Sequence, residues 1–448
     1  MRVRSVLSFA GCALLAACAH YRPSPLRDAD AVLSPPDMAL VSANAQTIDR
    51  PFLGPQPIDL SQPLTPNAIA ILAVMESPDL KALRAKNGVT YAQAFAARLL
   101  PDPIVQGSFD QRLSGPDPFN GFAGQIGFDL NQLRLAKVNR VSGEASKQQV
   151  RLDLAWAEWQ AAGQARLLGV RVLALIDQLA LAQASAASAQ RLFEATARAV
   201  GRGDLPAGDL DTRRLSALDA AERARTAERD LLAARGDLNR QLGLPPETVL
   251  RLAEPPEPIQ PPPADALVHE ALERRLDLQA LRAGYQAAEA NLHLAVLEQF
   301  PTLSLTAAYA RDTANNRTLG PQVGFTLPLW NRNRGGIAVT RATREQLKAE
   351  YEARLFQTRA EIDAAAVGLA AARKQRSTLI GQLPALERYA DATARAAKRG
   401  DLAPAAAETA AQSLRDRRLT LSTLTQQIAE QTIALELLTG TLSQGWTR

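Results

Sequence analysis

The side chains with the clearest potential for covalent or metal chemistry are two cysteines, Cys12 and Cys18, and three histidines. A thiol can form a disulfide, ligate a metal or carry a lipid. The histidines, His20, His269 and His293, are too few and too scattered along the chain to form a ligand cluster. We therefore expect no bound metal and no cofactor, and we look to a cysteine for covalent chemistry.

Cys18 follows an apolar N-terminal segment. Arg2 and Arg4 precede an apolar run over residues 6–17, which is too short to span a bilayer as a mature helix and is typical of a signal peptide. The tetrapeptide Leu15-Ala16-Ala17-Cys18 resembles a bacterial lipobox, in which the leader is cleaved before the cysteine and the thiol carries lipid. We predict a lipoprotein signal peptide over residues 1–17 and lipidation at Cys18. An ordinary leader that happens to contain this cysteine is the alternative.

The segment after Cys18 is rich in proline, which excludes long helices and favours extended structure. Residues 18–63 are therefore predicted to be a lipidated N-terminal tether. Ala19, in place of an aspartate after the cysteine, resembles lipoproteins that are exported to the outer membrane. Cleavage would also remove Cys12, so the mature protein could form no internal disulfide.

The remainder of the chain is an internal duplication. Residues 79–85 return 198 positions later as residues 277–283, and residues 125–130 return 197 positions later as residues 322–327. Solenoid repeats have periods of about 20–50 residues, so one large unit has been duplicated once. The predicted domains are a first repeat (64–245), a proline-rich linker (246–263), a second repeat (264–442) and a C-terminal tail (443–448).

Both repeats show the same predicted plan of a helix, two strands, a long helix and a shorter helix. In the first repeat these elements are predicted over residues 66–99, 104–112, 122–132, 136–200 and 207–242. In the second they are predicted over residues 264–298, 302–310, 322–330, 337–398 and 403–442. The long helices would reach about 90–95 Å, and residues 167–176 are apolar on more than one face, which implies burial on two sides. Pro384 is expected to interrupt and kink the second long helix.

The predicted strands alternate between apolar and polar residues, so that one face is apolar. The residues predicted to face lipid are Phe122, Ile126, Phe128, Leu130, Val323, Phe325 and Leu327. A half-buried soluble sheet shows the same alternation, but the predicted anchor and the long helices favour tilted transmembrane strands. Four strands cannot close a barrel, and open edges are costly in lipid, so such a chain would have to oligomerise.

Composition argues against two other classes of function. The net charge is +5, and acidic and basic residues are mixed along the chain, which gives little support for nucleic-acid binding. We find no catalytic triad, phosphate-binding loop or metal-ligand spacing, so we expect no enzymatic activity.

Taken together, the duplicated plan resembles the outer-membrane efflux protein family, the TolC-like outer-membrane factors, over about residues 63–442. The resemblance rests also on Gly324-Phe325-Thr326-Leu327-Pro328-Leu329-Trp330 and on the glycine-containing turn after each long helix. It implies a mainly α fold with a small β part, in which three chains form a twelve-stranded transmembrane β-barrel continued by a long α-helical barrel. It also implies a passive exit duct in the cell outer membrane, extending into the periplasm, whose partners are a periplasmic adaptor and an inner-membrane transporter.

The two turns would then lie at the periplasmic tips. They consist of Arg202, Gly203, Asp204 and Leu205 in the first repeat and Arg399, Gly400, Asp401 and Leu402 in the second. Glycine can end a helix and Asp can cap the next one, so these residues are either efficient turns or adaptor-docking tips, or both.

Residues 327–335 resemble the branch of the family associated with heavy-metal cation efflux. The cargo stays open, because substrate choice in this family resides largely in the pump. The alternatives are an outer-membrane duct for type I protein secretion and a periplasmic coiled-coil scaffold lipoprotein.

Overall fold

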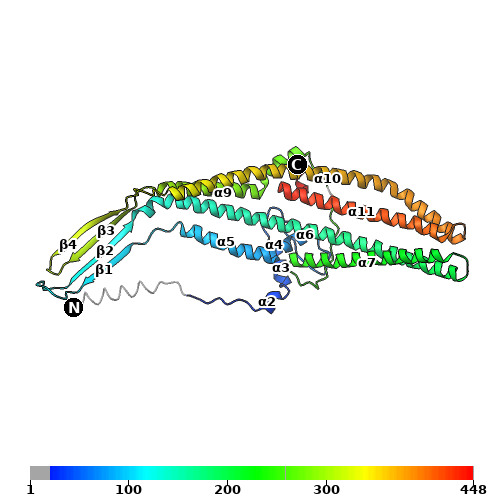
Figure 1. Cartoon of the computed structure of the whole chain (residues 1–448), viewed down its shortest axis with the longest axis horizontal. Coiled ribbons are helices and arrows are strands. Elements are labelled where there is room, and N and C mark those ends of the chain that lie inside the picture. Colours follow the sequence, from blue (N-terminus) through cyan, green and yellow to red (C-terminus); the bar gives the residue numbers. More distant parts are fainter. Residues whose placement is uncertain (1–20, 258, 447–448) are drawn as a thin grey trace. The chain divides into compact units, whose positions relative to one another are not determined.

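A computed structural model describes residues 21–257 and 259–446 (Figure 1). The predicted signal peptide and Cys18 lie outside these residues. The chain divides into two compact units, which meet between Pro36 and Asp37. In the first unit the described residues form exposed extended chain and one short helix, α2 (Ala29–Leu33).

The second unit begins with a short helix, α3 (Met38–Ala45), and then contains the same series of elements twice. The first series is α4 (Pro66–Glu76), α5 (Pro78–Ala96), β1 (Ile104–Asp110), β2 (Gly121–Asp129), α6 (Leu130–Gly201) and α7 (Ala207–Gln241). The second is α8 (Ala264–Arg274), α9 (Leu276–Leu297), β3 (Leu303–Arg311), β4 (Arg317–Phe325), α10 (Arg334–Arg399) and α11 (Pro404–Thr439). The predicted fold class, mainly α with four strands and an internal duplication, is confirmed.

Each predicted opening helix is in fact two helices. In the first repeat the break falls at Ser77, because Pro78 forces the residue before it into an extended conformation and itself suits the first helical position. In the second repeat no proline is present, yet Arg275 has nearly the same backbone angles as Ser77. There the buried Arg275 guanidinium donates to the Asp277 carboxylate at 3.0 and 2.7 Å.

The strands form one antiparallel sheet in the order β1-β2-β3-β4. β2 continues into α6 with no loop, and the Asp129 carboxylate accepts from the amide of Asn131 to cap the helix. The prediction for β4 was wrong: the strand starts at Arg317 and includes Pro321. An edge strand tolerates proline, because its outward-facing amide needs no partner.

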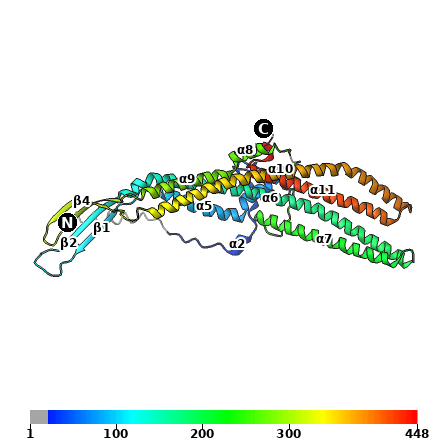
Figure 2. The ribbon, with the colours of Figure 1, turned by 45° about the horizontal axis from the view of Figure 1, so that its top comes forward.

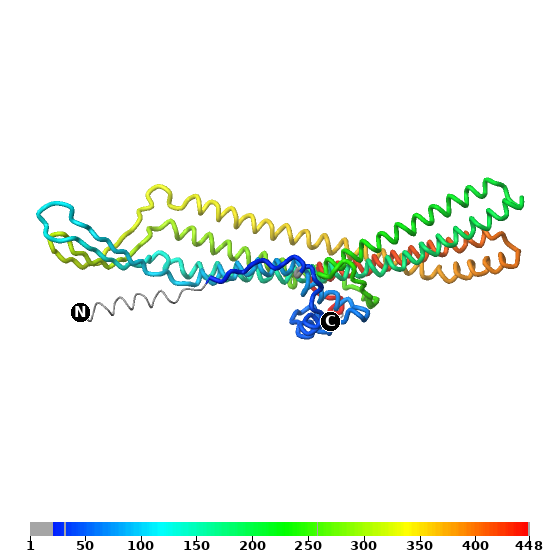
Figure 3. Tube along the Cα trace, turned by 90° about the horizontal axis from the view of Figure 1, so that it is seen from below, coloured from blue at the N-terminus to red at the C-terminus, as the bar shows by residue number. Residues whose placement is uncertain are grey.

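Within the second unit the sheet lies at one end and the turns that follow α6 and α10 lie at the other (Figure 1). The helix pairs α6–α7 and α10–α11 run toward these turns as two hairpins (Figure 2). Seen from below, the two turns lie at the same end (Figure 3). Pro384 does not interrupt α10, which continues from Arg334 to Arg399.

The core lies around the middle of α6, which packs against α4, α5, α7, α9 and α11. This environment explains the apolar stretch at residues 167–176. Within the described residues, α6 is the only helix long and apolar enough to cross a membrane by length and composition. α4 is buried on all sides, with Ile71, Leu72 and Ala73 fully inaccessible. The linker between the repeats is fixed to this core, because Leu64 pairs in parallel with Leu252.

Candidate functional site

The strand register separates the sheet into two faces of opposite character. Phe122 lies opposite Phe109 on one side and Arg311 on the other, while Phe128 lies opposite Leu305. Extended to all four strands, the alternation puts these large apolar side chains on one face: Val105, Phe109, Phe122, Ile126, Phe128, Leu303, Leu305, Tyr309, Leu319, Val323 and Phe325. Most are strongly exposed, Leu319 to 80%. A face so apolar needs a cover of lipid or protein.

The opposite face is polar and lined with small residues. It carries Gln106, Ser108, Gln125, Ser304, Thr306, Thr318 and Gln322. Gln125 donates to Gln106 on the neighbouring strand. At Gly127 an added Cβ would lie 2.6 Å from the Thr306 hydroxyl, so a side chain there would displace this threonine. Such a face suits contact with water.

The sheet has two free edges in the described chain, because β1 pairs only with β2 and β4 only with β3. An edge strand presents unpaired amides and carbonyls, which cost several kcal/mol each in hydrocarbon. One chain therefore cannot present this sheet to lipid alone.

Of the residues predicted to face lipid, Phe122, Ile126, Phe128, Val323 and Phe325 share the apolar face. The other two lie outside the strands. Leu130 is the first residue of α6, and Leu327 follows β4, with 62% of its surface exposed.

Six further residues of the apolar face were not predicted: Val105, Phe109, Leu303, Leu305, Tyr309 and Leu319. The alternation of the first five was visible in the sequence, whereas Leu319 lies before the predicted start of β4.

The two turns at the far end have the same geometry. Gly203 has φ of +79° and Gly400 of +81°, and the amides of Asp204 and Asp401 donate to carbonyls five residues earlier, as in a Schellman helix end. Neither aspartate caps the following helix as predicted. Instead each accepts from the arginine two residues before it, at 2.8 Å. All eight predicted tip residues are exposed.

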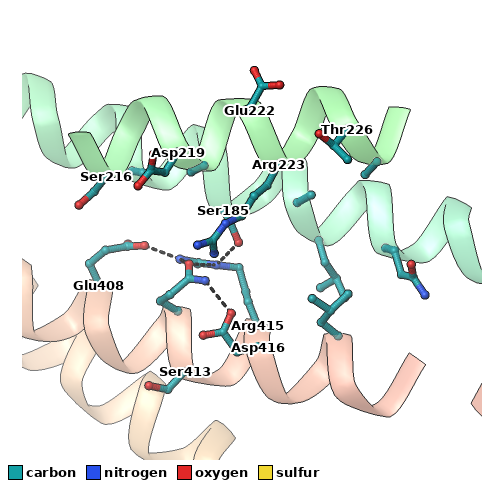
Figure 4. A pocket seen from close by; sticks show the side chains of 18 of the residues that line it. Ser185, Ser216, Asp219, Glu222, Arg223, Thr226, Glu408, Ser413, Arg415 and Asp416 are labelled. Atoms are coloured by element: carbon teal, nitrogen blue, oxygen red, sulfur yellow. Dashed lines mark hydrogen bonds and ion pairs between the residues drawn. The ribbon is translucent and has the colours of Figure 1, made fainter. Parts of the chain in front are cut away.

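A groove of about 920 Å³ lies between α6, α7 and α11 (Figure 4). Arg415 of α11 donates to Glu408 on its own helix and to the Ser185 hydroxyl of α6 at 3.1 Å. Ser188 donates to the same Glu408. These bonds tie the two helical hairpins together across the groove.

Residues 267–441 match the sequence model of the family described as outer membrane efflux protein. The second repeat is therefore similar to the outer membrane efflux protein family, as the sequence predicted.

Curated and solved proteins similar to this chain point to the same family. The chain is 24% identical to the cobalt-zinc-cadmium resistance protein CzcC of Cupriavidus metallidurans over 360 residues. This alignment covers 79% of this chain and 84% of that protein. Its fold is similar to CusC (TM-score 0.67, 17% identity, 88% of this chain and 98% of that chain). It is also similar to VceC of Vibrio cholerae (TM-score 0.67, 16% identity, 84% of this chain and 96% of that chain). A third similar structure is the CmeC outer membrane channel of Campylobacter jejuni (TM-score 0.70, 12% identity, 95% of this chain and 94% of that chain).

Buried charges join several helices of the second unit near its middle. The Glu158 carboxylate on α6 is 2% exposed and accepts from Arg84 of α5 at 2.7 Å and from Arg50 at 2.5 Å. The hydrogen bond to Glu158 raises the pKa of Arg50. Arg166 of α6 pairs with Glu436 of α11 at 2.7 Å. No sequence signal identified these pairs, because their members are far apart in the chain.

The described residues, 21–257 and 259–446, contain no group of three or more His, Cys, Asp or Glu side chains placed to hold a metal ion.

Proposed function

We propose that this protein is the passive exit duct of a tripartite efflux system. Three chains would join edge to edge, β4 of one to β1 of the next, and close a twelve-stranded barrel with the apolar face toward lipid. The observation that carries the proposal is the exposed, two-faced sheet with open edges at the end of a long helical body. Closure would satisfy both edges and leave the polar face around an aqueous channel.

The helices would continue this channel into the periplasm, with the repeats 64–245 and 264–442 as its two similar building units and residues 246–263 as their linker. The exposed turns at Arg202–Leu205 and Arg399–Leu402 would meet a periplasmic adaptor, and an inner-membrane transporter would supply the energy. The chain itself would perform no chemistry. Lipidation at Cys18 would add a second membrane anchor, with the chain before Asp37 as its tether.

The likeness to CzcC supports metal cations as cargo. The test is growth of a deletion strain on increasing zinc, cobalt or cadmium, with and without the cloned gene. We expect the gene to restore resistance, and equal sensitivity with and without it would contradict metal efflux. Export of a protein in place of metal would indicate type I secretion instead.

The barrel is tested by a charge on either face of one strand. Phe128→Arg places a cation on the apolar face, at a cost of about 2–4 kcal/mol near the bilayer midplane, whereas Gln125→Arg places it on the polar face. We expect the first variant to fail to insert into outer membranes and the second to insert normally, as measured by membrane fractionation and heat-modifiable electrophoretic mobility. Normal insertion of both would contradict the barrel.

A further inference from the structure

The apolar face of the sheet ends in a row that differs from all the others. Phe109, Phe122, Arg311 and Arg317 lie side by side across the four strands, by the register of each pair. The row lies at the hairpin end of the sheet, near the loops 111–120 and 312–316. It is therefore the row farthest from the helices. If the helices are periplasmic, it lies at the outer surface of the membrane.

Arg311 and Arg317 are direct cross-strand partners on the same face. Like charges in this arrangement repel and destabilise a strand pair. Within residues 21–257 and 259–446, neither guanidinium has a carboxylate within 4.0 Å, and Nε of Arg311 is buried with no hydrogen-bond partner. The pair thus carries two positive charges that the described chain does not neutralise.

The carboxylates at this end of the sheet have other partners or lie on the other face. Asp110 follows Phe109 in β1 and so points to the opposite, polar face. Asp117 accepts from the Thr313 hydroxyl at 2.5 Å. Asp312 accepts from both the amide and the side chain of Asn316, and these bonds lower its pKa.

Aromatic rings lie beside this row at the edge of the apolar surface. The Arg311 guanidinium lies 4.6 Å from the centre of the Phe119 ring, within the range of a cation–π contact. The next row inward brings Tyr309 to 5.7 Å from Phe122. Rings at the boundary between an apolar band and polar surroundings are typical of the interfacial girdle of a membrane barrel.

We propose that Arg311 and Arg317 together bind the phosphate of a membrane lipid in the outer leaflet, with its acyl chains on the apolar rows below. The proposal rests on the membrane insertion argued above. Guanidinium groups match phosphate oxygens with paired hydrogen bonds, and one phosphate between two arginines turns their repulsion into attraction. The occupant is a lipid, because the cationic row continues directly into the surface that faces acyl chains in the proposed barrel. In the outer membrane the phosphorylated lipid of that leaflet is lipopolysaccharide.

The test compares the double variant Arg311→Gln/Arg317→Gln with Arg112→Gln/Arg332→Gln, which removes the same charge. Arg112 donates to the Gly115 carbonyl at the hairpin end, and Arg332 to the Pro328 carbonyl near the helices. Purified full-length protein in detergent is titrated with lipid A, dephosphorylated lipid A or inorganic phosphate, and thermal unfolding is recorded. Each arginine near an anionic lipid surface contributes about a factor of five in affinity, so we expect lipid A to bind the first variant roughly thirtyfold more weakly.

The expected result is stabilisation of the wild type and the control by lipid A, with little effect from dephosphorylated lipid A or inorganic phosphate. Equal response of both variants to lipid A would overturn the proposal. Equal stabilisation by inorganic phosphate would also overturn it, since the site would then bind a free anion. Loss of the oligomer in the first variant alone would assign the pair to contact between chains. Failure of the wild type to insert into membranes would instead overturn the proposed duct, so the two failures are distinguishable.

Discussion

The two repeats agree at the turns that follow their long helices and differ in the middle. Their turns share the sequence Arg-Gly-Asp-Leu, a glycine with positive φ and an arginine–aspartate pair at the same distance of 2.8 Å. In the middle, the first repeat buries α4 entirely among residues that include the N-terminal segment from Val41 to Ile58. The second places the amphipathic α8 on α10 and α11. The turns are alike because both are exposed. The middles differ because the N-terminal segment packs on the first repeat only.

The largest expected effect concerns the buried carboxylate of Glu158, which binds the N-terminal segment to the first repeat through Arg50. Glu158→Gln leaves Arg50 and Arg84 without their buried counter-ion, and we expect a loss of about 2–4 kcal/mol, reduced from the usual cost because both arginines are partly exposed. The measurement is thermal unfolding of the detergent-solubilised protein. Glu222→Gln, which removes an exposed pair on α7, serves as the control and should change stability by less than about 0.5 kcal/mol. Equal effects would show that the buried site does not stabilise the middle.

The next effect tests the packing of one repeat against the other. A Cβ at Gly163 of α6 would lie 2.4 Å from the side chain of Leu437 in α11, so Gly163→Ala should destabilise by about 1–3 kcal/mol. Gly236 on α7 has open space, and Gly236→Ala should stabilise by about 0.5–1 kcal/mol. Both are read from unfolding temperatures. Stabilisation by both substitutions would mean that the repeats are not in close contact at Gly163.

The third test concerns the similarity of the ends. Gly203→Ala and Gly400→Ala each force a side chain into the left-handed region, with open space around it, at a cost of about 1 kcal/mol. We expect equal losses of stability in both variants. Bulky residues at the same sites should impair metal resistance with the trimer preserved. Normal resistance would show that the tips act only as turns.

The smallest expected effect depends on pH. Burial raises the pKa of Asp153, and the nearby Asp277 carboxylate raises it further. The folded state therefore disfavours the ionised form, and Asp153→Asn should raise the unfolding temperature at pH 7 by no more than about 1 °C. As the pH falls through the raised pKa toward the unfolded value, the wild-type carboxyl becomes protonated and the difference should vanish. A difference that persists in acid would point to packing instead of charge.

The sequence was sufficient where a local signal sets the structure. The order of elements in both repeats, the helix ends at Gly203 and Gly400 and the apolar face around Phe128 all follow from nearby residues. The break at Arg275 was not predictable, because no proline marks it and a side-chain ion pair holds it. The contact of Arg50 with Glu158 joins residues 108 positions apart, and such pairs depend on tertiary packing that no local pattern encodes.

The two connections between the sheet and the long helices differ in length. β2 enters α6 without an intervening residue, whereas residues 326–333 separate β4 from α10 and include left-handed conformations at Arg332 and Asn333. A rotation of α6 about its axis would therefore act on β2 directly, whereas a rotation of α10 would reach β4 only through this eight-residue link.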